Sequence, residues 1–304
     1  MNFLKKDRIN LVIHESTIRY LIHSGTTIVD YGELPLEQGI IDDGVIVKQD
    51  ALQNQLLTLV QQKKWKNKHV AICVPDAFVT IREEKIPAQL NREETKQYIL
   101  LEARDNIRLP IQNPLIDFAD LEEGPEDGFR KVLLFAFPKD KLQSYVDVFE
   151  HVHLKVAIAD VSFLSHYRVF HQLQLTKEHQ HLLLIQWGMH HLVLTVFNKE
   201  IPIFNRHIHI GHQRQAMDSD ALLQESIEDQ LLTIDRFIDF YRYSIMNDTA
   251  QVTDVLLVGD HPKRQTLQQI IQERLNIPIH QLSLPNDLAS YYSDVYGLTL
   301  RKKM

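Results

Sequence analysis

Closely spaced histidines are the first residues of this sequence whose types and spacing could do chemistry. His207 and His209 alternate along a predicted strand, so both lie on one side of it, and His212 follows closely. A His-x-His pair of this kind can chelate a transition metal. However, the spacing places no third strong ligand beside the pair. We therefore predict solvated or hydrogen-bonded histidines here and no metal site.

Other patterns that carry catalysis are weak in this sequence. Glu83 and Glu84 are adjacent carboxylates, but no partner acid lies at a spacing that predicts acid–base catalysis. The sequence has no Gly-x-Ser-x-Gly turn, no P-loop and no zinc-binding spacing. The basic run Lys63–Lys68 is interpreted as a solvated loop, with contact to anionic lipid headgroups as the alternative. Hydrolase and kinase chemistry therefore have no support.

Composition narrows the class of protein. The 304 residues are 44% hydrophobic and 24% charged, which is enough for two ordinary globular domains. A net charge of −7 argues against a nucleic-acid surface, which needs a concentrated positive field. No apolar stretch approaches the ~20 residues of a membrane span, and the first residues do not resemble a signal peptide. We expect a cytoplasmic protein that meets a membrane only through a partner.

The elements that must position any site follow a repeated order. Short apolar stretches bounded by turn residues predict a three-stranded meander over residues 8–34 and a second over 181–211. A helix and then a strand follow each meander. This repetition predicts an α/β protein with domains at 1–178 and 179–304. We predict an inserted subdomain at about 85–155, and a C-terminal tail that packs back on the first domain.

This order resembles the duplicated actin and Hsp70-like ATPase fold, which is ribonuclease H-like in each half. Within it, several segments are similar to the PilM family, the FtsA-like proteins of type IV pilus assembly. The similar segments are Gly39–Ile46, His69–Pro75 with Arg82 and Pro87, Glu102–Pro110, Leu231–Tyr241 and Gly297–Arg301. The likeness covers nearly the whole chain, and it depends on the order of these segments. It implies the same fold, with an inserted α+β subdomain.

The resemblance also implies a site for ATP and Mg²⁺ in the cleft between the domains. Such a site needs two aspartates near the metal and glycine turns that let backbone N–H groups approach phosphates. The first phosphate turn has the form Asp-x-Gly-x-x-Ser/Thr in these ATPases. Here Val12 stands at the aspartate and His14 at the glycine, with Ser16 and Thr17 following. Both the acid and the flexible residue are missing.

The other two nucleotide turns are altered as well. In the second, Gln186 replaces the aspartate, although Gly188 remains, and we predict a hairpin turn there with a positive φ. In the adenosine turn, Gly259 is followed by Asp260, which adds a charge, and Pro262 removes a backbone donor. The sequence therefore predicts a pseudo-ATPase with no cofactor. Weak or full ATPase activity with ATP and Mg²⁺ is the alternative.

The resemblance implies a cytoplasmic adaptor of a pilus or competence-type machine. Such a protein holds the N-terminal cytoplasmic tail of a PilN-like single-span membrane protein and meets other pilus platform proteins. The tail is expected in a groove between the insert and the first domain, near residues 76–108 and 156–163. An extended peptide gains main-chain hydrogen bonds along a strand edge and pockets for its side chains.

Beside this groove we predict a helix from Arg92 to Ile107. Its apolar anchors, proposed as partner-binding residues, are Tyr98, Ile99, Leu101 and Ile107. A membrane-associated filament former like FtsA is a further alternative. That function needs a C-terminal amphipathic helix, for which the final residues 300–304 are too short.

Overall fold

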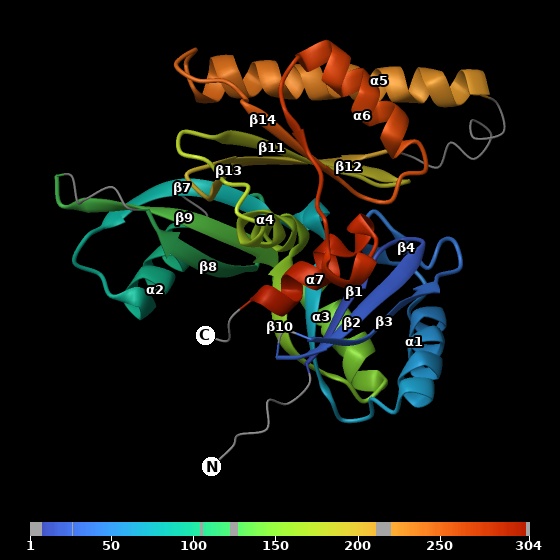
Figure 1. The fold of residues 1–304 in the computed structure, drawn as a ribbon. Coiled ribbons are helices and arrows are strands. Elements are labelled where there is room, and N and C mark those ends of the chain that lie inside the picture. The colour runs from blue at the N-terminus through green and yellow to red at the C-terminus, as the bar shows by residue number, and fades with distance from the viewer. Residues whose placement is uncertain (1–7, 26, 104–105, 122–126, 211–219, 302–304) are drawn as a thin grey trace.

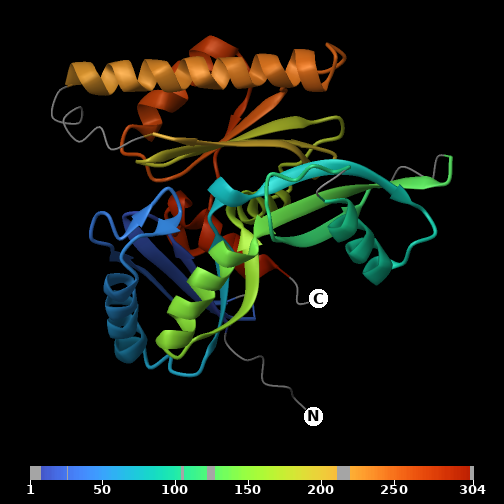
Figure 2. The same cartoon turned by 180° about the vertical axis from the view of Figure 1, so that it is seen from behind.

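The computed structural model describes residues 8–25, 27–103, 106–121, 127–210 and 220–301, without the side chains of residues 220–226. Within these residues two five-stranded sheets lie one above the other, and a three-stranded sheet projects to one side (Figure 1). The same arrangement is seen from behind in Figure 2. None of the described helices combines the length and the hydropathy needed to cross a membrane.

The first large sheet begins with an antiparallel meander, as the alternating apolar residues predict. Two later strands add to it in parallel, giving the order β10-β6-β1-β2-β3. Helices α1 and α3 pack apolar residues against one face, beside a small β4-β5 ribbon. The bounds are β1 (Arg8–Ile13), β2 (Thr17–Ser24), β3 (Thr27–Pro35), β4 (Ile41–Asp42), β5 (Val45–Ile46), α1 (Gln49–Lys63), β6 (His69–Val74), α3 (Lys139–His151) and β10 (Lys155–Val161).

The second large sheet repeats this topology, with the order β13-β12-β11-β14-β15. Its meander is again antiparallel, and β14 and β15 add in parallel. Strand β11 is buried from Leu182 to Trp187 because helices cover both faces of the sheet. The bounds are β11 (His181–Trp187), β12 (His191–Asn198), β13 (Ile201–His209), α5 (Asp220–Phe240) with a π-helical turn (Tyr241–Ile245), β14 (Asp254–Val258), α6 (Arg264–Leu275) and β15 (Ile279–His280).

The inserted sheet has the order β7-β9-β8 and is covered by α2. Its elements are β7 (Thr80–Pro87), α2 (Arg92–Glu102), β8 (Pro114–Asp120) and β9 (Phe129–Pro138). The predicted insert of about 85–155 also contained α3. In the structure Tyr145, Val148 and Phe149 of α3 pack in the core of the first sheet instead. An amphipathic pattern indicates that one helix face is buried, but not which sheet covers it.

Helix α2 begins as predicted but ends early. The Asn91 side chain accepts hydrogen bonds from the first turn, and Glu94 completes a capping box. The helix ends at Glu102, whereas the prediction extended it to Ile107. Ile107 and Leu109 are buried in the core of the insert, so the chain must turn before them rather than continue as a helix.

Two helices join the sheets at the centre of the molecule. Helix α4 (Ser162–Gln172) lies against α7 (Ser293–Leu300), and the core around them contains residues of both large sheets. A Cβ atom at Gly297 would lie 2.0 Å from the Ser165 carbonyl oxygen, so glycine permits this close helix contact. Helix α7 also packs on β1, β2 and β6, which places the end of the described chain on the first sheet.

Candidate functional site

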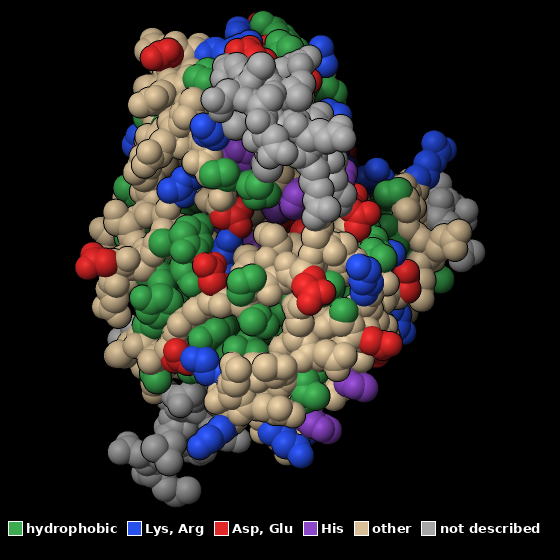
Figure 3. Space-filling view, turned by 90° about the vertical axis from the view of Figure 1, so that its right-hand side faces the viewer, with side chains coloured by type: hydrophobic (Ala, Val, Ile, Leu, Met, Phe, Trp, Pro, Cys, Tyr) green, Lys and Arg blue, Asp and Glu red, His purple; other side chains and the backbone are tan. Residues whose placement is uncertain are grey.

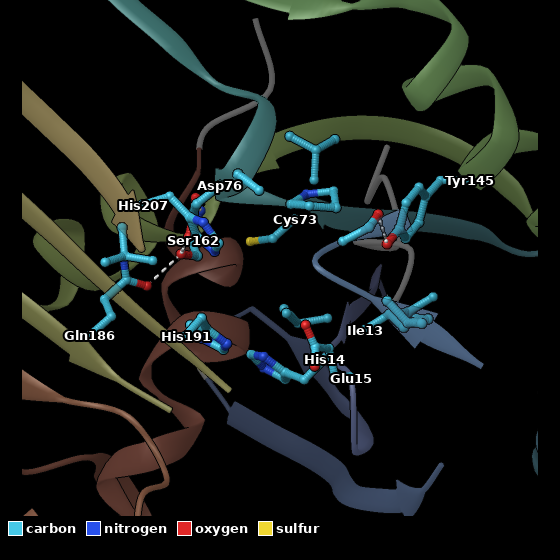
Figure 4. A pocket seen from close by; sticks show the side chains of 17 residues that line it. Ile13, His14, Glu15, Cys73, Asp76, Tyr145, Ser162, Gln186, His191 and His207 are labelled. Carbon is cyan, nitrogen blue, oxygen red and sulfur yellow. Dashed lines mark hydrogen bonds between the residues drawn. The ribbon is translucent and has the colours of Figure 1, made fainter. Parts of the chain in front are cut away.

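The altered nucleotide turns come together between the two large sheets. Val12, His14 and Gln186 line one cavity there, which we call the cleft cavity. In Figure 4 the rings of His14 and His191 point toward one another, and their centroids are 6.5 Å apart. The predicted hydroxyl positions do not line this cavity. Ser16 is exposed, and the Thr17 hydroxyl donates to the Leu34 carbonyl group.

The cleft cavity has a volume of about 70 Å³. Ligand pockets of small molecules typically measure about 300–1,000 Å³, whereas one water occupies about 30 Å³ in the liquid. The cleft cavity is therefore smaller than a typical small-molecule pocket. In the space-filling view, histidines and charged side chains gather in a hollow between the upper and lower parts of the molecule (Figure 3).

A buried arginine contacts His14 in the wall of the cleft cavity. Arg19 on β2 is only 3% exposed. Its Nη2 donates to Asp260 of the other sheet, and its Nη1 lies 3.6 Å from Asp294 on α7. His14 Nε2 is 2.7 Å from the same Asp294 carboxylate. His14 and Asp260, which both depart from the nucleotide turns, are thus parts of one network that links the two domains.

The pKa values of the two acids follow from this network. Burial alone would raise the pKa of Asp294, but His14 and Arg19 outweigh it and hold that pKa below its usual range. Burial likewise raises the pKa of Asp260, but the charge and hydrogen bond of Arg19, together with the charges of His14 and His191, lower it below its usual value. Both carboxylates therefore remain ionised and paired with groups of this chain. Arg19 is engaged on both sides rather than presented to a phosphate.

The two glycines of the altered turns behave differently. Gly259 has a φ of 110°, and a Cβ atom there would lie 2.2 Å from the Trp187 carbonyl oxygen. The space that glycine provides is therefore filled by the protein itself. The prediction of a positive φ at Gly188 is wrong, because this residue is absent from the positive-φ residues of the described chain. Its constraint is the ring of His191, which would lie 2.7 Å from a Cβ atom at Gly188.

A buried acid that the sequence interpretation missed lies near Gln186. The Ser162 hydroxyl lies within hydrogen-bond distance of Asp76 and is 2.5 Å from Gln186 Oε1. Burial raises the pKa of Asp76 to about 6, although its hydrogen bonds from Ser162 oppose the shift. A carboxyl group with this pKa is still mostly ionised at pH 7, so Asp76 is a buried acid beside the altered second turn.

The histidines first singled out lie at the edge of the same region. His207 Nδ1 and His209 Nδ1 lie 3.6 Å and 3.5 Å from Asp43 Oδ1. Zinc–nitrogen bonds measure about 2.0–2.1 Å, and among the described residues no three His, Cys, Asp or Glu side chains are grouped to hold a metal. His212 lies outside the described residues. Burial lowers the pKa of His207, which favours the neutral ring.

A larger cavity lies between the insert and the first domain. We call it the insert groove, and its volume is about 520 Å³. Strand β8 is the edge of the inserted sheet and β10 is the edge of the first sheet, so two strand edges border it. Its walls are mostly apolar, and they come from residues 115–119 on β8, 135–137 on β9, 159–161 on β10, and Leu164 on α4.

The predicted groove segments contribute only part of this wall. Val79 and Arg92 come from the predicted range 76–108, and residues 159–161 from the range 156–163. Most of the remaining wall belongs to β8 and β9, which the sequence did not single out. Within β8 only Phe118 is buried, and the strand has no regular alternation that could have singled it out from the sequence.

The four predicted partner-binding residues do not line the insert groove. Ile99 and Ile107 are buried in the core of the insert, and Tyr98 packs against that core. Leu101 was predicted as an anchor, but it is 77% exposed. Because α2 is a short helix with a narrow buried face, helical spacing alone assigned Leu101 to the wrong side.

Comparisons with known proteins identify the family. The family model described as "Type IV pilus assembly protein PilM" matches residues 20–220, more than half of the chain. This chain belongs to the PilM family. The prediction of the family is therefore confirmed. A search of curated protein sequences gives no significant match.

Solved structures confirm the predicted actin-like fold class of this PilM family member. A protein of a "PilM-PilN type IV pilus biogenesis complex" aligns with a TM-score of 0.81 at 15% identity, over 97% of this chain and 98% of that one. The ethanolamine utilization protein EutJ from Carboxydothermus hydrogenoformans aligns at 0.54 with 9% identity, over 97% and 89%. MreB 5 of Spiroplasma citri, solved with AMPPNP, aligns at 0.53 with 10% identity, over 97% and 95%.

Proposed function

We propose that this protein is an adaptor of a type IV pilus or competence-type machine that binds the N-terminal cytoplasmic tail of a PilN-like membrane protein. The observation that carries the proposal is the insert groove, an apolar cavity of about 520 Å³ between two strand edges. Similarity to a protein solved in a PilM-PilN complex supports this partner. The adaptor then lies in the cytoplasm, held at the inner face of the membrane by its partner, beside other pilus platform proteins.

The groove suits an extended peptide for two physical reasons. In the described structure, β8 pairs only with β9, so its outer edge offers backbone groups to an added strand. The apolar walls offer places for alternate side chains of that strand, each contributing about 1.5–3 kcal/mol when fully buried. After the costs of ordering, two or three such side chains support micromolar binding, about −8 kcal/mol.

The proposal includes the loss of ATP handling. The small cleft cavity and the engagement of Arg19 with Asp260 and Asp294 support a pseudo-ATPase. Calorimetry with ATP and Mg²⁺ is expected to detect no binding tighter than the millimolar range, about −4 kcal/mol. Micromolar binding with turnover would favour the active actin-like ATPase instead. A filament former related to FtsA is tested by sedimentation of the protein with and without ATP.

The adaptor itself is tested by titrating the full-length protein with a synthetic peptide. The peptide has the sequence of the N-terminal tail of the single-span protein encoded beside it. We expect micromolar binding that Ala119→Trp abolishes, because Ala119 is an exposed wall residue of the groove. Leu101→Trp is the matched control, since Leu101 is exposed on the same insert but outside the groove. Equal binding by both variants would reject this site.

A further inference from the structure

One end of the insert groove contains two arginines that share one buried carboxylate. Arg168 Nη2 lies 2.7 Å from Asp160 Oδ2, and Arg301 Nη1 lies 2.9 Å from Asp160 Oδ1. Asp160 is 4% exposed and lies near the end of β10, whereas the two arginine side chains remain about a quarter exposed, at 25% and 24%. All three residues line the groove. The cluster is therefore part of the wall that a bound peptide would face.

Positive charge exceeds negative charge at this cluster. Arg8 lies close by, since it donates from Nη1 to the Arg301 carbonyl oxygen at 3.1 Å. Burial lowers the pKa of Arg8, and the charges of Arg168 and Arg301 lower it further, while Asp160 raises it. At this end of the groove three guanidinium groups thus lie near one carboxylate, in a protein whose net charge is −7. The other carboxylate of the described groove wall, Asp117, pairs with Arg92. An additional anion at this place would be stabilised by the local field.

Arg301 also has unused hydrogen-bonding capacity. Within the described residues, its side chain donates only from Nη1, to Asp160 and to the Ala159 carbonyl oxygen at 3.5 Å. A guanidinium group carries five N–H donors in a planar fork that fits a carboxylate with two parallel bonds. The Nε and Nη2 groups of Arg301 are therefore available to a ligand in the groove.

The opposite wall makes an extended peptide a better occupant than a free anion. Apolar residues of β8 and β9, together with Val161 and Leu164, surround the space beside the arginines. A small inorganic anion would leave these apolar surfaces in water. A peptide that carries both a carboxylate and apolar side chains satisfies the two kinds of wall at once.

We propose that the insert groove selects a tail with an Asp or Glu side chain that pairs with Arg301, flanked by apolar residues that fill the rest of the groove. This inference rests on the proposed adaptor function and adds the chemistry of the partner. Arg168 shares Asp160 with Arg301, so the buried carboxylate stays paired while Nε and Nη2 of Arg301 bind the peptide.

The test is a selection of peptides by the immobilised full-length protein. The probe is a positional-scanning library of acetylated, amidated octapeptides, in which each position is varied in turn against a fixed apolar background. We expect Asp and Glu to be enriched at one position by the wild-type protein. Arg301→Gln should lose this enrichment while keeping the apolar preferences at the other positions, and Arg301→Lys should retain part of it. Ala119→Trp should retain no peptide.

A matched peptide pair on the wild-type protein makes the test independent of variant folding. The selected acidic peptide and its Gln counterpart are compared by fluorescence anisotropy at low and high salt. We expect the Gln peptide to bind about tenfold more weakly at low salt, with a smaller difference at high salt. Equal affinities, with the same apolar selection by Arg301→Gln, would overturn the acidic contact and leave the adaptor function standing. No peptide retained, or retention unchanged by Ala119→Trp, would overturn both.

Discussion

The cleft cavity and the insert groove are both bordered by two sheets, yet the arginines beside them differ in burial and in ion pairing. In the cleft, Arg19 is 3% exposed and pairs with Asp260 and Asp294 of distant segments. In the groove, Arg301 has one neighbour carboxylate and keeps donors for a ligand, and β8 keeps a bare edge within the described structure. Charges that pair within the protein, as in the cleft, hold the domains together. Hydrogen-bond donors that have no partner in the described protein, as in the groove, can bind a peptide.

The altered residues of the cleft also have a structural role. His14 and Asp260 are two of the residues that depart from the nucleotide turns, and both are members of the network around Arg19. Substitutions that would weaken binding to phosphate thus supply contacts between the domains. Changes in the cleft should therefore lower the free energy of unfolding, whereas changes in the groove should alter peptide binding.

The largest expected effect is at Gly259. Gly259→Ala combines a φ of 110° with a Cβ atom 2.2 Å from the Trp187 carbonyl oxygen, so the turn must shift. We expect the free energy of unfolding to fall by more than about 4 kcal/mol, measured by chemical denaturation. Gly39→Ala is the control, because its φ is 73° but its nearest contact is 3.8 Å away. That variant should lose only about 1 kcal/mol.

The next effect concerns the ion pairs of Arg19. Arg19→Met removes this partner from the buried Asp294 and the partly exposed Asp260, and we expect destabilisation of about 3 kcal/mol. Arg301→Met should lose about 1 kcal/mol or less, because that side chain is partly exposed. Urea unfolding of both variants measures the difference. Similar losses for the two arginines would remove the contrast between the cleft and the groove.

A third prediction uses the pH dependence of the cleft. Burial lowers the pKa of His166 to about 4, against about 6.5 in an unfolded chain. Between these values the unfolded state binds a proton that the native state does not, so acidification favours unfolding. His166→Gln does not titrate and keeps a hydrogen-bonding group toward Ser293, which His166 contacts at 2.8 Å. Between about pH 7 and pH 5, the free energy of unfolding of the variant should fall by about 2 kcal/mol less than that of the wild type.

Unfolding curves at both pH values give this difference directly. Asp76 acts in the opposite direction, since its raised pKa of about 6 adds stability as the pH falls through that value. Because both proteins contain Asp76, its contribution cancels in the comparison. A wild type and a His166→Gln variant with parallel pH profiles would show that His166 is not the titrating group.

The smallest expected effect is at Gly188. The sequence predicted a positive φ at this residue, which the structure does not have. Gly188→Ala would still place a methyl group 2.7 Å from Cε1 of His191, and a side-chain ring can move away more easily than backbone can. We therefore expect a loss of about 1 kcal/mol or less in thermal or chemical unfolding. A loss as large as that of Gly259→Ala would show that the His191 ring cannot move.

Local patterns in the sequence were sufficient for the elements but not for their partners. The alternation along β1 and β2 predicted strands, and the Asn91 position predicted the start of α2, because both depend on residues a few positions apart. The family and the actin-like fold were predictable from the order of such segments. The end of α2 and the exposure of Leu101 were not, since they depend on how the insert folds over its own core.

The sequence alone determined that the nucleotide turns are altered, because Val12, His14, Gln186 and Asp260 are substitutions that any fold would carry. Only the tertiary structure decided what these residues do instead. Arg19 and Asp260 are 241 positions apart and come from different sheets, and no local periodicity connects them. The insert groove likewise depends on the tertiary structure, because its walls include the edge strands β8 and β10 of two different sheets. Pairing of charges and opening of cavities depend on distances in space, which the duplicated fold sets.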